Sequence, residues 1–127
     1  MPETSIANNM KSLTFAKLRK VNVARCEKHF HKLDDWSESD WACALAGEVG
    51  EFCNFIKKRR RAQDDLFVKY SGKKAPKGKF KEDCKKEIGD IIAYLDLNAA
   101  KLGLTLEECI RDKFNEVSKR VKSKHRL

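Results

Sequence analysis

Two pairs of acidic residues are the part of this sequence best suited to chemistry. Glu48 and Glu51 lie three residues apart, and Glu87 and Asp90 repeat that spacing. Residues three apart lie on one face of an α-helix. If two such faces turn toward each other, four carboxylates surround one space, where repulsion and lost solvation favour binding of a cation. Because all these ligand atoms are oxygens, the pattern predicts a site for Mg²⁺ or Mn²⁺ rather than for zinc.

A simpler interpretation is that the acidic pairs are solvated, as most acidic side chains are. The surrounding sequence argues against it, because both pairs are embedded among apolar residues. The apolar neighbours of the first pair are Ala42, Ala44, Leu45, Ala46, Val49, Phe52, Phe55 and Ile56. Those of the second pair are Ile88, Ile91, Ile92, Ala93 and Leu95. Each pair is therefore expected beside or within a buried face, which favours one shared metal site.

Length and composition are typical of a soluble, helix-rich protein with a single domain spanning residues 1–127. Of the 127 residues, 41% are hydrophobic and 37% are charged, which is enough for a hydrophobic core without disulfide bonds. No apolar run approaches the roughly 18 residues of a transmembrane helix. Residues 1–9 are polar and lack the apolar segment of a signal peptide. We therefore expect a cytoplasmic protein that does not enter a membrane.

The cysteine pattern agrees with a reducing compartment. The five cysteines are Cys26, Cys43, Cys53, Cys84 and Cys109. The count is odd, no two of them form a C-x-x-C motif, and most occupy apolar helix positions. The pattern predicts reduced core residues rather than a disulfide framework or a zinc site.

The charge of the chain points to a polyanionic partner. The net charge is +9, and much of the excess lies in residues 57–61, 69–81 and 119–126. Such a balance favours a nucleic acid, the phosphates of a nucleotide or an acidic surface. The acidic pairs lie outside these basic stretches.

Helical periodicity accounts for most of the chain, and strand-like alternation is nearly absent. Thr14 can cap a first helix that reaches about His31, followed by a connection over residues 33–39. Ser39 or Asp40 can cap a second helix that reaches about Arg60. Residues 1–12 are expected to be a flexible start.

The second half of the chain adds two further helices. Residues 61–79 interrupt the periodicity and are predicted to form a basic loop. We favour a solvated loop over a substrate lid. The segment lacks the residue order G-x-x-x-x-G-K-[ST] of a P-loop. A third helix is expected from about Phe80 to Leu102, with Gly103 directly after it. The segment Thr105 to Glu108 fits a capping box for a fourth helix to about Arg120. Residues 122–127 form a basic tail. The expected fold is an all-α bundle of four to five helices.

Two features of the predicted helices bear on the site. Apolar residues of the second helix form one stripe, namely Trp41, Leu45, Val49, Phe52 and Ile56. Gly47 and Gly50 each reduce helix propensity by roughly 1 kcal/mol relative to alanine. They therefore indicate close backbone approach, either by a packed helix or by a ligand.

His29 and His31 are only two residues apart, so we expect surface or partly buried histidines rather than metal ligands.

The motifs resemble those of one enzyme family. Gly-Glu-Val-Gly-Glu-Phe at residues 47–52, a basic interval, and Glu-Ile-Gly-Asp-Ile-Ile-Ala-Tyr-Leu at residues 87–95 are similar to the MazG-type all-α nucleoside triphosphate pyrophosphohydrolases. Leu-Gly-Leu-Thr-Leu-Glu-Glu-Cys-Ile at residues 102–110 and Lys-Phe-Asn-Glu-Val-Ser-Lys-Arg at residues 113–120 continue the likeness. The resemblance covers residues 41 to about 120.

The resemblance implies a metal-dependent hydrolase. Glu48, Glu51, Glu87 and Asp90 would ligate Mg²⁺, and a nucleoside triphosphate would be cleaved between its α- and β-phosphates to a monophosphate and pyrophosphate. A divalent cation would neutralise phosphate charge and lower the pKa of a coordinated water. Phosphoryl-type transfer mainly requires positioning and charge stabilisation. One of the carboxylates could also act as general base, and we select Glu51.

The resemblance also implies contacts to the substrate. Lys113 and Arg120 on the last helix would contact phosphates, and Tyr94, one turn after Asp90, would hold the sugar or base. Either tryptophan could stack on a base. Trp36 is the better candidate because Trp41 fits the core stripe.

One substrate-binding position departs from the family pattern. Val117 stands where family members often carry an asparagine, four residues after the matching lysine. Asn115 lies nearby but on another helix face, so it is a less certain substrate contact.

Members of this family are dimers or dimers of dimers, so the resemblance implies a homodimer or homotetramer with sites near subunit interfaces. The expected substrate is a deoxy or non-standard nucleoside triphosphate, consistent with nucleotide-pool housekeeping.

Two alternatives remain. One is a catalytically inactive nucleic-acid-binding or interaction protein with the same fold, supported by the charge of +9. The other is an enzyme that cleaves alarmones by the same mechanism.

Overall fold

The structure is a computed structural model that describes residues 12–63 and 80–127. Within these ranges it contains four α-helices, one 3₁₀ turn and no strand, which confirms the predicted all-α fold. The elements are α2 (Phe15–His29), η1 (Leu33–Asp35), α3 (Glu38–Gln63), α5 (Phe80–Lys101) and α6 (Leu106–Arg120). Residues 1–11 of the predicted flexible start (1–12) and residues 64–79 of the predicted basic loop (61–79) lie outside the described residues. No described helix is long and apolar enough to cross a membrane.

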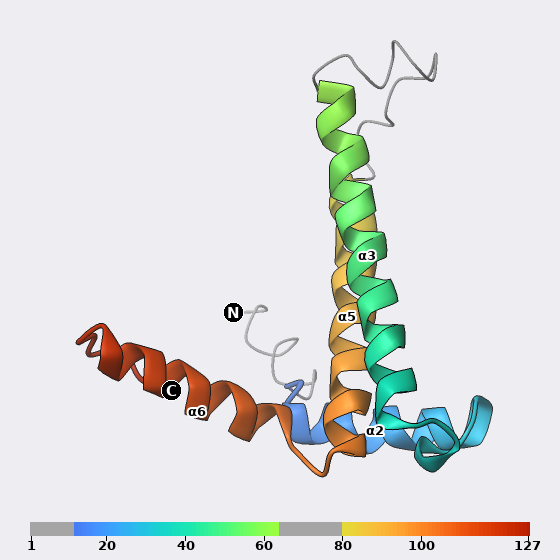
Figure 1. Ribbon diagram of the computed structural model, residues 1–127, viewed down its shortest axis with the longest axis horizontal. Helices are drawn as coiled ribbons and strands as arrows, with labels where there is room; N and C mark the ends of the chain where they lie inside the picture. The colour runs from blue at the N-terminus through green and yellow to red at the C-terminus, as the bar shows by residue number, and fades with distance from the viewer. Residues whose placement is uncertain (1–11, 64–79) are drawn as a thin grey trace, which may run out of the picture.

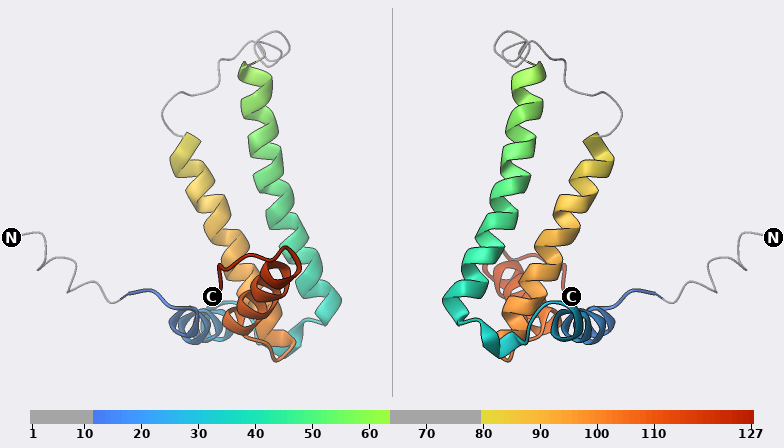
Figure 2. Two further views of the ribbon diagram at one scale, coloured as in Figure 1. Left: turned by 90° about the vertical axis from the view of Figure 1, so that its left-hand side faces the viewer. Right: turned by 90° about the vertical axis from the view of Figure 1, so that its right-hand side faces the viewer.

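A long antiparallel pair of helices dominates the structure. α3 and α5 run side by side, and α2 crosses one end of the pair near η1 (Figures 1 and 2). α6 extends away from that end to one side, and its main contact within the chain is with α2 (Figure 1). A single chain therefore does not close a four-helix bundle.

The ends of α2 and α6 follow the sequence prediction. Thr14 caps α2 by accepting a hydrogen bond of 3.1 Å from the amide of Lys17. Thr105 caps α6 in the same way, accepting from the amide of Glu108 at 3.1 Å. Each bond satisfies an amide that has no partner inside the helix. α2 ends at His29, two residues before the expected end.

The start of α3 differs from the prediction, because Ser37 rather than Ser39 or Asp40 is the capping residue. Ser37 Oγ accepts from the amide of Asp40 at 3.2 Å, and the Asp40 carboxylate accepts from the amide of Ser37 at 3.0 Å. These bonds from Ser37 lower the pKa of Asp40. Both expected caps already lie in the first turn of α3, which begins at Glu38 and ends at Gln63, beyond the expected Arg60.

The turn after α5 explains how α6 is directed away from the bundle. Gly103 has a positive φ of 72°, which glycine adopts without strain. The amide of Leu104 donates to Ala99 O at 2.8 Å and that of Gly103 donates to Ala100 O at 3.1 Å. These two bonds form a Schellman motif, which confirms the predicted helix end.

The core lies where α2, η1, α3 and α5 meet. Trp41 is only 1% exposed and packs with Cys26 and Leu97, and its Nε1 donates to Leu33 O at 3.0 Å. This position confirms that Trp41 belongs to the core stripe.

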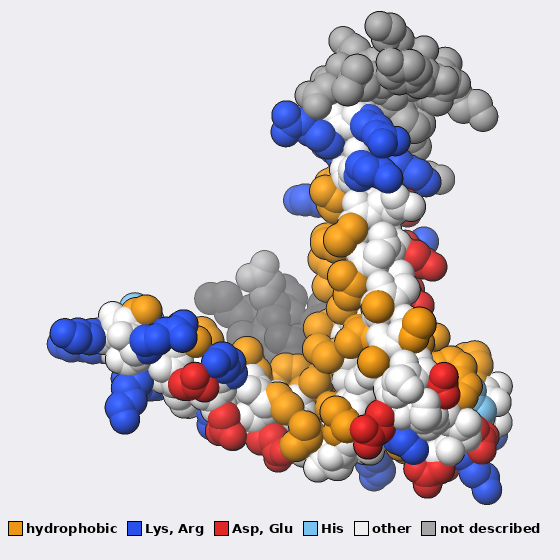
Figure 3. All heavy atoms as spheres, viewed as in Figure 1, with side chains coloured by type: hydrophobic (Ala, Val, Ile, Leu, Met, Phe, Trp, Pro, Cys, Tyr) orange, Lys and Arg blue, Asp and Glu red, His pale blue; other side chains and the backbone are white. Residues whose placement is uncertain are grey.

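Much of the remaining apolar surface is exposed. Val49 and Ile56 of the predicted α3 stripe are exposed. Apolar residues of α5, of α6 and of the segments that follow these helices are exposed as well, namely Ile88, Leu95, Leu102, Ile110, Phe114 and Val121. Figure 3 shows hydrophobic side chains along α3 and in the corner between it and α6. Three cysteines are also exposed, so the expectation that most are core residues is wrong for Cys43, Cys53 and Cys109. The reason is that no described segment of the same chain covers these faces.

The two glycines of α3 are not explained by close packing within the chain. A methyl group placed at Gly47 or Gly50 would meet no atom within 4 Å. The close approach predicted from these glycines is therefore not made by any described part of the same chain.

Candidate metal centre and adjoining cavity

The antiparallel packing of α3 and α5 brings the two acidic motifs together. Ligand oxygens of Glu48, Glu51 and Glu87 all lie within 4.8 Å of one another. Asp90 does not belong to this group of three, but it is close enough to influence Glu48 electrostatically. We call these four residues the acidic cluster. Three of the four predicted ligands therefore converge, and the fourth lies beside them.

The electrostatics of the acidic cluster fit a cation. Burial raises the pKa of Glu48 above its ordinary value, and repulsion from Glu51, Asp90 and Glu87 adds to the shift. Glu87 Oε2 is buried, and no described group donates a hydrogen bond to it. An unpartnered buried carboxylate oxygen is unfavourable. A divalent cation would compensate both effects, and oxygen ligands are the ones that Mg²⁺ prefers.

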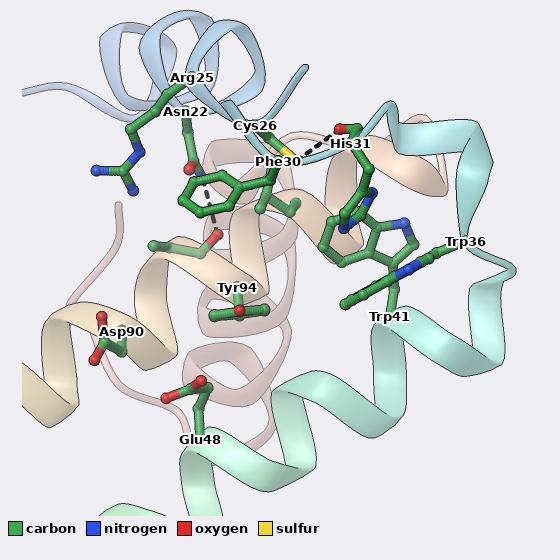
Figure 4. A pocket seen from close by; sticks show the side chains of 12 residues that line it. Asn22, Arg25, Cys26, Phe30, His31, Trp36, Trp41, Glu48, Asp90 and Tyr94 are labelled. Carbon is green, nitrogen blue, oxygen red and sulfur yellow. Dashed lines mark hydrogen bonds between the residues drawn. The ribbon is translucent and has the colours of Figure 1, made fainter. Parts of the chain in front are cut away.

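A cavity of about 420 Å³ adjoins the acidic cluster. This volume is in the range of about 300–1,000 Å³ that is usual for small-molecule sites. Figure 4 shows acidic side chains on one side of the cavity and aromatic rings on another. Its lining residues are Asn22, Arg25, Cys26, Phe30, His31, Trp36, Trp41, Glu48, Asp90, Ala93, Tyr94 and Leu97.

Aromatic rings form one wall of the cavity. The ring centroids of His31 and Trp36 are 4.2 Å apart, and those of Trp36 and Trp41 are 4.7 Å apart. Tyr94 continues the wall at 6.5 Å from Trp41. Phe30 also lines the cavity, although it is 74% exposed. The wall offers aromatic faces that suit a planar heterocycle.

Tyr94 lies between the aromatic wall and the carboxylates. Burial raises the pKa of its phenol, and the negative charges of Glu48 and Asp90 raise it further. The hydroxyl therefore stays protonated at neutral pH and can donate a hydrogen bond.

The predicted substrate residues of α6 are not at the cavity. Lys113 forms an ion pair of 2.9 Å with Glu116 on its own helix. Asn115 exchanges two hydrogen bonds with the backbone of Leu127, at 3.1 and 3.0 Å. Neither these residues nor Arg120 lines the cavity, because α6 extends away from α3 and α5 (Figure 1).

Sequence reasoning missed several residues of the cavity. His31 is partly buried, as expected, but its place in the cavity lining beside Trp36 was not predicted. Asn22 and Arg25 also line the cavity, and neither was predicted as a site residue. Asn22 could have been found, because it is a polar residue four positions from both Leu18 and Cys26 in the apolar stripe of α2. Arg25 carries no comparable signal.

Comparisons with protein-family models, with curated proteins and with solved structures found no match to this chain.

Proposed function

We propose that the chain is a Mg²⁺-dependent nucleoside triphosphate pyrophosphohydrolase, which cleaves its substrate between the α- and β-phosphates. The observation that carries the proposal is a single cavity with aromatic rings on one side and Glu48 and Asp90 on another. A nucleotide has matching parts, a planar base and a polyanion that needs a cation. The resemblance of residues 41–120 to MazG-type enzymes supports the same activity.

The aromatic wall would bind the base. Trp36 is half-buried and lies beside His31, so its ring can stack on a heterocycle while the neighbouring rings hold it in place. Stacking on an aromatic side chain contributes about 1–3 kcal/mol per base. Tyr94 would donate its phenolic hydrogen to the sugar or base.

The acidic cluster would hold the metal. Glu48, Glu51, Glu87 and Asp90 would supply the oxygen ligands, and bound Mg²⁺ supplies positive charge that offsets the triphosphate and acidifies water. Glu51 is exposed, unlike the half-buried Glu48 and Glu87. Asp90 is exposed as well, so exposure does not choose between these two carboxylates, and we propose Glu51 as the residue that accepts a proton from the attacking water. Arg25 lines the cavity on the side of Asp90 (Figure 4) and would attract the phosphates.

The proposal includes a homo-oligomer, either a dimer or a tetramer. The exposed apolar faces of α5 and α6 would be covered by a second copy. α6 of that copy could bring Lys113 and Arg120 to the phosphates, which they do not reach within one chain. The enzyme would act on nucleotide pools in the cytoplasm.

The test is pyrophosphate release from a panel of standard and modified ribo- and deoxynucleoside triphosphates, with Mg²⁺ and with EDTA. We expect release from one or a few members of the panel in Mg²⁺ and none in EDTA. Absence of release from folded, oligomeric protein would contradict the proposal. The same assay with alarmones then tests the alternative substrate class.

A second candidate is a nucleic-acid-binding protein without catalysis. It is favoured by the net charge of +9 and by the basic side chains near the far end of α3 and on α6 (Figure 3). Its expected signature is affinity for DNA or RNA that falls steeply with salt, together with no nucleotide turnover. The clustered carboxylates argue against it, because they repel a polyanion unless a metal is bound.

A further inference from the structure

We infer that Asn22 determines base specificity, because its side-chain oxygen accepts a hydrogen bond from an N–H group on the edge of the bound base. The inference rests on the proposed function and names a contact within that site. Asn22 is only 4% exposed and lines the cavity from α2. Figure 4 shows Asn22 and Glu48 on opposite sides of the cavity, with Phe30 and Tyr94 between them in this view. The cavity that both residues line has a volume of about 420 Å³.

The orientation of the Asn22 amide is fixed by its neighbours. Nδ2 donates to Ala93 O at 2.8 Å and to Asp96 Oδ2 at 3.2 Å. Both amide hydrogens are therefore used. If the amide were reversed, its oxygen would face a carbonyl and a carboxylate, neither of which can donate. The oxygen Oδ1 is consequently the group that remains available.

The acceptor that holds the amide is itself held in place. Asp96 is 1% exposed and pairs with Arg19, whose Nε lies 2.9 Å from Oδ1 of Asp96. The Arg19 guanidinium also donates to the carbonyl oxygens of Asp96 at 3.3 Å and Leu104 at 2.6 Å. The chain Arg19–Asp96–Asn22 thus orients the amide by connecting α2 with α5 and with the turn before α6.

No described group of the chain donates to Asn22 Oδ1. A nearly buried acceptor in a cavity wall favours a ligand that brings a donor, since a ligand without one leaves the acceptor unpaired. On a base, that donor is an exocyclic amine or a ring N–H. The inference therefore concerns the polar edge of the base, whereas the aromatic wall recognises only its faces.

The test uses nucleosides, so that neither phosphate, metal nor hydrolysis is involved. Quenching of the fluorescence of Trp36 and Trp41 reports binding in the cavity. Deoxycytidine is compared with N4,N4-dimethyldeoxycytidine, thymidine with N3-methylthymidine, and deoxyadenosine with N6,N6-dimethyldeoxyadenosine. For the nucleoside that binds best, we expect methylation to weaken binding to the wild-type chain by about 30-fold. In Asn22→Ala the effect should fall to about threefold or less.

Asn98→Ala is the matched control. Like Asn22 Nδ2, Asn98 Nδ2 donates two hydrogen bonds, in this case both to backbone carbonyls, Trp41 O at 3.0 Å and Tyr94 O at 2.8 Å. Asn98 does not line this cavity. The control loses a comparable pair of bonds and should retain the full methylation effect. If general loosening of the cavity wall were enough to remove specificity, Asn98→Ala would lose the methylation effect as well.

Three outcomes would overturn the inference. In the first, the wild-type chain binds methylated and unmethylated nucleosides equally. This measurement needs no variant, so it tests the inference even if Asn22→Ala does not fold. Asn22→Ala could keep the full discrimination. No nucleoside could bind at all.

Failure of the proposed function looks different, because Asn22-dependent nucleoside binding would persist while no triphosphate released pyrophosphate. Conversely, pyrophosphate release with unchanged base preference in Asn22→Ala would refute only this inference.

Discussion

At the scale of single residues, Glu87 shows most clearly what the acidic cluster requires. Its Oε2 is buried without a hydrogen-bond donor, and the carboxylates of Glu48 and Glu51 lie within 4.8 Å of its ligand oxygen. Without a cation, such a group lowers the stability of the fold. Function and stability are therefore opposed at this position.

Glu87→Gln should stabilise the protein when no metal is present. The neutral amide removes repulsion and can donate to the neighbouring carboxylates, so we expect a gain of about 1 kcal/mol in the free energy of unfolding and a melting temperature higher by about 3 °C in EDTA. Added Mg²⁺ should stabilise the wild type but not the variant. Thermal unfolding with EDTA and with Mg²⁺ measures both effects.

The matched control for this prediction is Glu82→Gln, one and a half turns earlier on α5. The Glu82 side chain is exposed and lies 4.0 Å from Lys85. An exposed pair of this kind contributes little, so the melting temperature of Glu82→Gln should equal that of the wild type both in EDTA and in Mg²⁺. Destabilisation of Glu87→Gln in EDTA would contradict the interpretation of the cluster.

Glu51→Gln should abolish pyrophosphate release while the fold remains intact. The amide can neither accept a proton from water nor ligate Mg²⁺ as a carboxylate does, so we expect a loss of at least about 100-fold. Turnover and circular dichroism should be measured together, with Glu38→Gln at the exposed start of α3 as the control. Full activity of Glu51→Gln would exclude this assignment of the site.

At the scale of elements, α2 is held against α5 by polar contacts more than by apolar ones. The buried residues of α2 are Asn22 and Cys26, and Arg19 adds its ion pair with Asp96. This arrangement fixes one wall of the cavity relative to the acidic cluster. It also means that the position of α2 depends on a few specific bonds.

Arg19→Met should therefore destabilise the protein strongly. It leaves the carboxylate of Asp96 buried without its cation, and breaking a buried pair in this way costs about 3 kcal/mol. Lys101→Met is the control, because its partner Asp34 is 95% exposed and an exposed pair contributes less than about 1 kcal/mol. Urea unfolding of the two variants should differ clearly. Equal midpoints would show that the Arg19–Asp96 pair is not structurally important.

At the scale of the whole molecule, residues 12–63 and 80–127 leave much of their own apolar surface uncovered. α6 projects from the other helices, and its residues Ile110 and Phe114 are exposed (Figures 1 and 2). An apolar groove of about 460 Å³ continues from α6 onto Leu95 of α5 and onto Leu102 in the turn after it. Exposed apolar patches of this kind are typical of interaction sites. The same face would serve both partners of a two-fold dimer.

Phe114→Asp should convert the proposed oligomer into monomers. A carboxylate placed in an apolar interface loses its solvation without gaining a partner. Sedimentation velocity should show an oligomer for the wild type and a monomer for this variant. Arg111→Glu, on the same helix and paired with Glu107 at 2.9 Å, should remain oligomeric. A monomeric wild type would refute the proposed assembly.

Most helix ends of this protein can be predicted from the amino-acid sequence, because the signals that mark them are local. Thr14, Thr105 and Gly103 mark helix ends through bonds to residues within five positions, and the spacing of each acidic pair requires only one turn of helix. Where two local signals competed, the prediction failed by a few residues, as when Ser37 rather than Ser39 capped α3.

The composition of the cavity follows from the tertiary structure and not from any local pattern in the sequence. Asn22, Trp36 and Tyr94 come from three separate segments, and His31 follows the end of α2, so no spacing rule relates them. The position of α6 likewise depends on the turn at Gly103 and on its contact with α2, which separates Lys113 from the acidic cluster within the chain. Local patterns predict which residues share a face of a helix. Which faces then meet depends on packing between segments that are distant in the sequence.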